Sequence, residues 1–216
     1  MMDPRKADIF FATASGKAGG PHWAYLQGCI EATHAFPGDK FFPAGLYPHP
    51  RRGLYVENNR DALTAAFLAS GQAHLLFVDT DIGFGAQHIQ MLLDAERDVV
   101  SGFYVYQDDA RQEFVGKLLD EQDGDLRRAS VVPGGFLLCT RRAIAQLCAH
   151  RSDYIYSVDG IGIVTALWQS TFAPGQPWER DDAAFSRHCL DAGLDMWVHM
   201  GCRLVHYGEK AYFGEA

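Results

Sequence analysis

The segment Leu75-Leu76-Phe77-Val78-Asp79-Thr80-Asp81 decides the fold class of this chain. Its run of apolar residues predicts a strand buried on both faces, as in a parallel sheet. Open α/β sheets bind their ligands at the carboxyl ends of such strands, where the two aspartates lie. Because alternate residues of a strand face the same side, Asp79 and Asp81 are expected to address one ion while Thr80 points elsewhere. Aspartate is also common in plain turns, which is the alternative interpretation.

Composition narrows the class of protein further. The chain has 216 residues, 48% of them hydrophobic, which is enough for a buried core and predicts one domain over residues 1–216. A net charge of −8 gives no basic surface for nucleic acid or for an anionic membrane. We expect no transmembrane segment and no signal peptide. Five scattered cysteines without a C-x-x-C pair are typical of reduced thiols, so the expected location is cytoplasmic.

The order of predicted elements is that of an α/β protein. Strand-like and helix-like segments alternate through the first half, which indicates a doubly wound α/β arrangement. The expected strands there are 8–12, 41–42, 75–78 and 99–104. The expected helices are one that begins near residue 21 and two at 60–70 and 86–95. The second half is mixed, with antiparallel pieces. Its expected elements are a hairpin of 114–119 and 126–132 through Asp123-Gly124, a strand at 135–140, helices at 141–150 and 181–192, and a strand near 196–199. Residues 43–59 are expected to form a loop, and 153–178 an aromatic-rich irregular segment.

Three further features carry possible chemistry, each with a plainer alternative. Asp181 and Asp182 open a predicted helix, so they are either helix caps or carboxylates held as a general base. Gly134-Gly135 permits the close approach of a ligand or backbone, although a turn or bulge explains it equally well. His206 follows the last strand and is either structural or a third ligand beside an Asp-x-Asp metal.

Taken together and in this order, these motifs resemble the nucleotide-sugar-dependent glycosyltransferases of the GT-A fold, and among them small bacterial and algal-virus enzymes. The resemblance spans nearly the whole chain and rests on five segments. These are Arg60-Asp61-Ala62-Leu63, Leu75–Phe84 (LLFVDTDIGF), Pro133–Arg142 (PGGFLLCTRR), Asp181–Phe185 (DDAAF) and Leu194–Gly208. The family's usual asparagine is replaced by Asp61, and an aspartate replaces its first acid at Asp181.

The resemblance implies a fold and a reaction. The fold is a single Rossmann-like GT-A domain with a mostly parallel central sheet and a small antiparallel addition in the C-terminal half. Residues 1–105 would form its nucleotide-binding half and 106–216 its acceptor half. The implied reaction is hexosyl or deoxyhexosyl transfer from a nucleoside diphosphate sugar, with uridine favoured, to a hydroxyl of a glycan or another acceptor.

The resemblance also implies roles for individual residues. Asp81, less directly Asp79, and His206 would hold Mn²⁺ or Mg²⁺ against the donor diphosphate, where the ion acts as a Lewis acid. Asp182, with Asp181 beside it, would deprotonate the acceptor if the enzyme inverts configuration. The residues implied to border the nucleotide are Thr13, Ala14, Ser15, Arg60, Asp79, Thr80 and Asp81. The aromatic candidates for sugar stacking are Tyr154, Tyr156, Trp168, Phe172 and Trp178, with core packing as their alternative.

Three other functions compete with this one. A phosphatase of the haloacid dehalogenase type would place the Asp-x-Asp motif after the first strand and a Thr or Val where Gly83 stands. A nucleotidyltransferase that makes nucleotide sugars would carry a Gly-rich basic loop after the first strand, and Ser15–Gly20 matches this in part. A non-catalytic nucleotide-sugar-binding module would bind its ligand without turnover.

Overall fold

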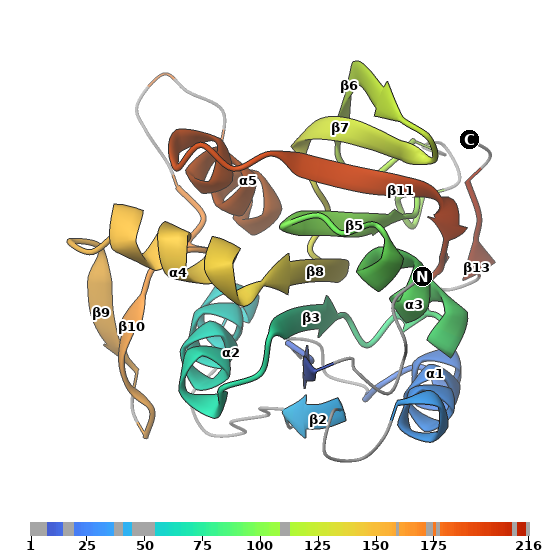
Figure 1. The fold of residues 1–216 in the computed structure, drawn as a ribbon, viewed down its shortest axis with the longest axis horizontal. Coiled ribbons are helices and arrows are strands. Elements are labelled where there is room, and N and C mark those ends of the chain that lie inside the picture. The colour runs from blue at the N-terminus through green and yellow to red at the C-terminus, as the bar shows by residue number, and fades with distance from the viewer. Residues whose placement is uncertain are drawn as a thin grey trace.

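The computed structural model describes residues 8–14, 20–36, 41–44 as backbone, 55–108, 113–158, 160–171, 175, 178–208 and 211–214. The strands of its main sheet are β1 (Ile9–Ala12), β2 (Phe41–Ala44), β3 (His74–Val78), β5 (Val99–Phe103), β6 (Lys117–Asp123), β7 (Leu126–Val131), β8 (Phe136–Thr140) and β11 (Met196–Arg203). The helices are α1 (Trp23–Ala35), α2 (Val56–Ser70), α3 (Ala86–Asp94), α4 (Arg141–His150) and α5 (Asp181–Asp191). Figure 1 shows these helices arranged around the sheet.

The main sheet is mixed, with the strand order β2-β1-β3-β8-β5-β11-β7-β6. The pairs β1–β2, β1–β3 and β5–β11 are parallel, and the pairs that involve β8 or β7 are antiparallel. The expectation of a mostly parallel sheet is therefore too simple. Strand β8 comes from the second half of the chain, yet it lies in the centre, antiparallel to both β3 and β5. Consequently β3 and β5 run in the same direction, and their carboxyl ends meet at one edge of the sheet.

Two buried clusters cover the two faces of the sheet. On β3, Leu75 and Phe77 belong to the cluster that α2, α4 and α5 complete, whereas Leu76 and Val78 belong to the cluster that α1 and α3 complete. This alternation is the period of two expected of a strand, here with apolar residues on both faces. The apolar run before Asp79 thus predicts β3 correctly, and the molecule has helices on both sides of one sheet.

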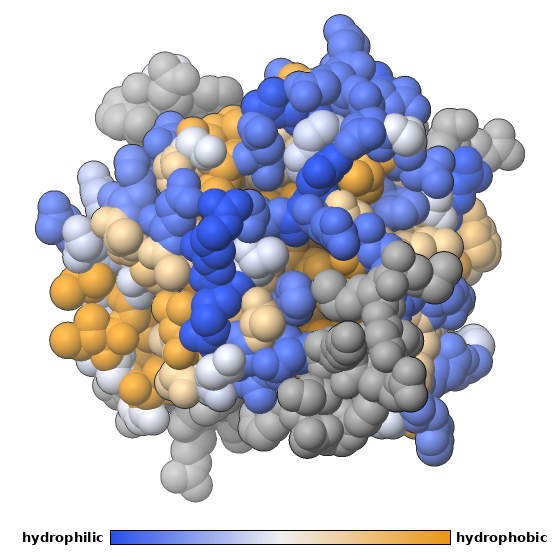
Figure 2. Space-filling model, viewed as in Figure 1, coloured by the Kyte–Doolittle hydropathy of each residue, from blue (hydrophilic) through white to orange (hydrophobic). Residues whose placement is uncertain are grey.

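The predicted hairpin turn is confirmed, whereas three segments differ from their expected bounds. The first is β6, which runs from Lys117 to Asp123 where a strand at 114–119 was expected. The Asp123-Gly124 turn joins β6 to β7, with Gly124 in the left-handed region at φ +59°. Helix α2 begins at Val56, inside the expected loop 43–59. The expected irregular segment 153–178 contains a separate hairpin of β9 (Ile155–Val158) and β10 (Gly162–Thr165). Its strands are short and have exposed apolar residues, Ile155 and Ile163, so they lack the polar-outward alternation by which a half-buried strand is recognised. Figure 2 shows hydrophobic surface at the left edge of the molecule, where Figure 1 places this hairpin.

Helix α1 lies with its large apolar residues outward. Trp23, Leu26 and Ile30 have the spacing that predicts the helix, but all three are exposed. The buried side instead consists of Tyr25 and three small residues, Ala24, Gly28 and Ala32. A β-carbon on Gly28 would lie 2.6 Å from the carbonyl oxygen of Phe84. Close packing of the backbone therefore decides which side of α1 faces the sheet. None of the described helices is long and apolar enough to cross a membrane.

A second small sheet stands beside the carboxyl end of β3. It consists of β4 (Ile82–Gly83), β12 (Val205–Tyr207) and β13 (Ala211–Tyr212), in the order β13-β12-β4. His206 pairs with Ile82, and the backbone N–H of Tyr207 donates to the carbonyl oxygen of Asp81 at 2.8 Å. The end of the chain is thereby fixed against the turn that follows β3.

Candidate functional site

A pocket of about 960 Å³ opens at the edge of the sheet where β1 and β3 end. The strand order reverses between β1 and β3, because the chain goes from β1 to β2 on one side of it and then returns to β3 on the other side. Such a switch point is where open α/β sheets bind ligands. The residues that line the pocket are Ala14, Tyr55, Val56, Glu57, Arg60, Asp79, Thr80, Asp81, Gln107, Trp178, Arg180, Asp181, Asp182 and His206.

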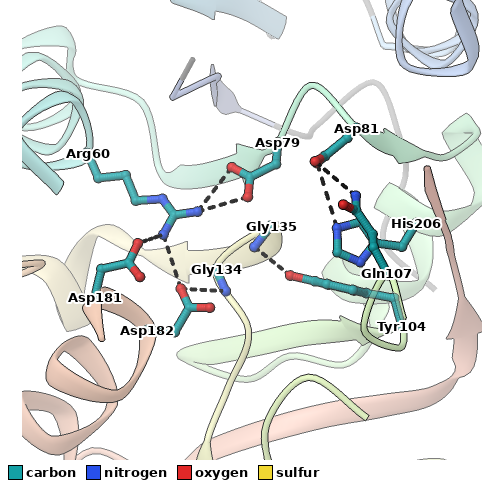
Figure 3. Close-up of polar contacts among 10 residues, drawn as sticks. All are labelled: Arg60, Asp79, Asp81, Tyr104, Gln107, Gly134, Gly135, Asp181, Asp182 and His206. Atoms are coloured by element: carbon teal, nitrogen blue, oxygen red, sulfur yellow. Dashed lines mark hydrogen bonds and ion pairs between the residues drawn. The ribbon is translucent and has the colours of Figure 1, made fainter. Parts of the chain in front are cut away.

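Arg60 is the centre of one wall of this pocket (Figure 3). Its side chain is only 3% exposed and extends from α2 to three carboxylates. Nη2 donates to both oxygens of Asp79 at 3.0 Å, and Nη1 donates to Asp181 at 2.5 Å and to Asp182 at 3.0 Å. One guanidinium therefore joins the end of β3 to the start of α5, and it is outnumbered by the carboxylates it contacts.

The electrostatics of this wall follow from burial and from the excess of acid. Burial alone would lower the pKa of Arg60, but the three carboxylates raise it, so the guanidinium stays charged. Burial raises the pKa of Asp182 to about 7, against the opposing effect of Arg60, and the neighbouring Asp181 and Asp79 raise it further. Burial also raises the pKa of Asp79. Asp182 is thus a carboxyl group that changes charge near neutral pH.

Asp181 and Asp182 lie in the first turn of α5, where their charge complements the helix dipole as the plainer interpretation expects, but neither residue is the cap. The N-cap position of α5 is Arg180, and no side chain makes a capping hydrogen bond there. Instead Oδ1 of Asp182 accepts hydrogen bonds from Arg60 and from the backbone N–H of Gly134, the latter at 3.1 Å. Within the part of the chain that the structure describes, nothing hydrogen-bonds its Oδ2, and Figure 3 shows that oxygen pointing away from Arg60.

The glycine pair at the start of β8 is required by close approach. A β-carbon on Gly134 would lie 2.6 Å from Oδ1 of Asp182 and 2.9 Å from Nη1 of Arg60. A β-carbon on Gly135 would lie 2.5 Å from the hydroxyl oxygen of Tyr104, which accepts the Gly135 N–H at 2.8 Å. Both interpretations are confirmed, because the glycines form the turn before β8 and also allow the close approach of Asp182, Arg60 and Tyr104.

On the other wall of the pocket lie Asp81 and His206 (Figure 3). His206 Nε2 is 3.8 Å from Oδ1 of Asp81, while its Nδ1 is 2.8 Å from the carbonyl oxygen of Val105. A carbonyl oxygen only accepts, so Nδ1 carries the proton and Nε2 presents its lone pair to the pocket. Gln107 donates from Nε2 to Oδ2 of Asp81 at 3.1 Å and to the carbonyl oxygen of Tyr207 at 2.6 Å.

The expectation that Asp79 and Asp81 face the same way is wrong. Strand β3 ends at Val78, and Thr80 and Asp81 form a turn, so the strand alternation does not extend to the second acid. Asp79 points to Arg60, whereas Asp81 points to His206 and Gln107 (Figure 3). Among the described residues, no cluster of three or more His, Cys, Asp or Glu side chains is arranged to hold a metal ion.

Other residues expected at the site fall into three groups. Ala14 and Thr80 line the pocket, whereas Thr13 is buried and its hydroxyl lies 2.5 Å from that of Tyr25. Ser15 and Phe172 lie outside the described residues. Of the other stacking candidates, Trp178 lines the pocket, Tyr154 is exposed on the chain leading into β9, and Tyr156 and Trp168 are engaged in packing and hydrogen bonds. Missing from the sequence-based set are Tyr55, Tyr104 and Gln107, because isolated aromatic and amide residues have no motif of their own.

Asp61 has a structural role that its neighbour Arg60 does not share. It is 1% exposed, and its oxygens accept four hydrogen bonds, one from β9 and three from the segment that follows β10. Oδ1 accepts from the backbone N–H groups of Leu167 at 2.8 Å and Trp168 at 3.1 Å. Oδ2 accepts from Gln169 at 2.7 Å and from the hydroxyl of Tyr156 at 2.9 Å. Asp61 therefore clamps this segment onto α2.

The Asp61 clamp predicts a specific pH dependence of stability. Burial raises the pKa of Asp61 from 3.8 to about 6, so between these values the folded state binds more protons than the unfolded state. Stability from this group is fully present below pH 3.8 and is lost as the pH rises through about 6, by about 3 kcal/mol in all. We expect urea unfolding of Asp61→Asn to lack this loss, because the amide oxygen still accepts from the two backbone N–H groups.

Two further variants check the assignment to Asp61. Asp61→Ala should be less stable than the wild type at every pH, because it leaves the donors unpaired. Asp120→Asn, a change at a fully exposed acid on β6, should keep the pH profile of the wild type. A wild-type profile retained by Asp61→Asn would contradict the role of this carboxyl.

Comparisons with known proteins add to the description of the fold. The chain matches no protein-family model and no curated protein sequence. Among solved structures it is similar to A197 from STIV, with a TM-score of 0.53 and 13% sequence identity over 97% of this chain and 95% of that one. At this level of identity the similarity shows a shared α/β fold across almost the full length of both chains.

Proposed function

We propose that this protein is a metal-dependent glycosyltransferase of the GT-A type, which moves a sugar from a nucleoside diphosphate sugar to an acceptor hydroxyl. The observation that carries the proposal is the division of one pocket into two acidic walls. Asp81 and His206 form one wall, and Asp182 stands on the other with a pKa of about 7. A donor and an acceptor need such separate groups, one near the leaving phosphate and one near the attacking oxygen.

The donor set of the first wall suits Mn²⁺ or Mg²⁺. A carboxylate oxygen and an imidazole nitrogen are acceptable to Mn²⁺, and the hydrogen bond from His206 to Val105 orients the ring as it does in many metal ligands. A bound divalent ion would neutralise negative charge on the departing nucleoside diphosphate. The pocket lining holds five carboxylates against two guanidinium groups, so a diphosphate needs such a counter-charge in order to bind there.

Asp182 is proposed as the general base of an inverting transfer. Its Oδ1 is held by Arg60 and Gly134, which leaves Oδ2 to accept the proton of the acceptor hydroxyl. A base is most effective when its pKa lies near the working pH, and burial raises the pKa of Asp182 to about 7. Arg60 keeps the carboxylate in place beside the pocket, and the same guanidinium also binds Asp181.

The direct test is release of nucleoside diphosphate from uridine and guanosine diphosphate sugars in the presence of Mn²⁺. We expect one donor to be hydrolysed slowly without acceptor, and we expect Asp81→Ala to lower this rate by about a hundredfold. The control is Asp195→Ala. Asp195 is an exposed acid that pairs with Arg128, and it lies just before β11 and outside the pocket lining. Equal rates for wild type and Asp81→Ala with every donor would refute the proposal.

The same purified protein separates the alternatives. Pyrophosphate release from a nucleoside triphosphate and a sugar phosphate would identify a nucleotidyltransferase. Tight binding of a nucleotide sugar, seen as a rise in melting temperature with Mn²⁺ and without turnover, would identify a binding module.

A further inference from the structure

Two exposed aromatic rings flank the acid wall of the pocket. Tyr55 is 76% exposed and Trp178 is 61% exposed, and both line the same pocket as Asp182. Of the aromatic side chains that the structure describes, most are buried in the two clusters that cover the sheet. Rings that remain exposed at the rim of a pocket retain apolar surface that a ligand can cover.

Both rings are held by backbone contacts next to the helices that supply the acid wall. Tyr55 occupies the N-cap position of α2, and its carbonyl oxygen accepts the N–H of Asn59 at 3.2 Å. Trp178 precedes Glu179, whose backbone N–H and carbonyl oxygen both pair with Thr171 at 3.0 Å. The backbone that carries each ring is therefore held close to the first turn of a helix, and the Arg180 guanidinium lies 5.8 Å from the centroid of the Trp178 ring.

Both rings are close in sequence to residues of the wall that holds Asp182. Helix α2 leads from Tyr55 to Arg60, and the chain after Trp178 leads into Asp181 and Asp182 at the start of α5. Figure 3 shows Arg60, Asp181 and Asp182 on one side of the site and Asp81, Gln107 and His206 on the other. In the chain, both rings therefore adjoin the segments that carry Arg60 and the proposed general base Asp182.

The charge of the pocket selects among acceptors. Glu57, Asp79 and Asp81 add to the two acids of α5, and among the described residues that line the pocket Arg60 and Arg180 are the cations that oppose them. An anionic acceptor would be repelled from such a wall, whereas an uncharged polyol can donate hydroxyl hydrogen bonds to the carboxylates. A pyranose ring combines hydroxyl groups at its edge with an apolar C–H face, and that face matches an aromatic ring.

We propose that Tyr55 and Trp178 form the binding site for an uncharged glycan acceptor, whose ring stacks on the aromatic side chains and directs a hydroxyl to Asp182. This assignment rests on the proposed function, which it extends by naming the acceptor class. It assigns no role to Trp23, which is 63% exposed on α1 and is not part of the pocket lining.

Binding measurements test the site without turnover. The probes are the methyl glycosides of glucose, galactose, mannose and N-acetylglucosamine, titrated by ligand-observed NMR, and UDP with Mn²⁺, titrated by calorimetry. We expect at least one glycoside to bind the wild type, and we expect Tyr55→Ala and Trp178→Ala to weaken it by about five- to tenfold. Tyr55→Phe and Trp178→Phe keep a ring and should retain most of the affinity. Trp23→Ala is the matched control and should bind as the wild type does.

The outcomes distinguish this site from the proposed function. Affinity for UDP with Mn²⁺ should change by less than about twofold in the alanine variants, because the two walls are separate. If these variants weaken UDP and spare the glycosides, the rings hold a nucleobase and the acceptor site is refuted. It is equally refuted if no glycoside binds the wild type. If glycosides bind through the rings but no nucleotide binds with Mn²⁺, the glycan site stands and the transferase proposal fails.

Discussion

Replacing Arg60 by methionine is expected to lower the free energy of unfolding by about 3 kcal/mol at pH 7, because it leaves carboxylates beside one another without their cation. Asp79 and Asp182 retain 29% and 26% of their side-chain surface, so water compensates part of the loss. The effect should shrink towards pH 5, where these acids, whose pKa values are raised, take up protons. Chemical denaturation at both pH values measures it.

The control for Arg60 is an arginine on the surface. Arg142 pairs with Asp98 but is 69% exposed, and Arg142→Met should change stability by less than about 1 kcal/mol. A second substitution, Asp79→Asn, should recover part of the stability lost in Arg60→Met, since it removes one of the unpaired charges. Equal losses in Arg60→Met and Arg142→Met would contradict the role of Arg60 as the centre of the acid wall.

Asp182→Asn is expected to lower the rate of sugar transfer by about 10²- to 10⁴-fold while the Michaelis constant for the donor stays nearly unchanged. The amide oxygen can still accept from Arg60 and Gly134, so the wall keeps its shape and loses only its base. In the wild type the rate should rise with pH through about 7, the pKa to which burial raises Asp182. The variant should lack this limb in a pH–rate profile.

Asp181→Asn separates the base from its neighbour. Asp181 lies on the same helix turn and binds the same guanidinium at 2.5 Å. If Asp182 is the base, Asp181→Asn should lower the rate by less than about tenfold and keep a rising limb with pH. A larger loss of rate in Asp181→Asn than in Asp182→Asn would show that Asp181, and not Asp182, is the base. An unchanged rate in both variants would show that neither acid is the base.

The sequence was informative where one local pattern decided the structure. The apolar run of β3 predicts a strand covered on both faces, and Asp123-Gly124 predicts a hairpin turn, and both are confirmed. The spacing of Trp23, Leu26 and Ile30 predicts helix α1 but not that these residues face outward. That orientation depends on the contact between Gly28 and Phe84, which are far apart in the sequence.

The candidate site was predictable as a set of residues and not as a geometry. Eight of the residues named from sequence line the pocket: Ala14, Arg60, Asp79, Thr80, Asp81, Asp181, Asp182 and His206. Trp178, named for stacking, lines it as well. The contact between Arg60 and Asp79 was not predictable, because it depends on where β3 ends and on how α2 crosses the sheet. Asp61 gave no signal of its clamp, since its partners follow more than 90 residues later.

The central position of β8 has a consequence for how the chain can be divided. Strands β3 and β5 both precede residue 105, yet in the sheet they are separated by β8, which spans Phe136–Thr140. A nucleotide-binding half cut at residue 105 would leave both strands with open hydrogen-bonding edges and without the partner that bridges them. The sheet is continuous only when β8 pairs with both β3 and β5, so the two halves named from sequence share one sheet and neither half contains all of its neighbouring strands.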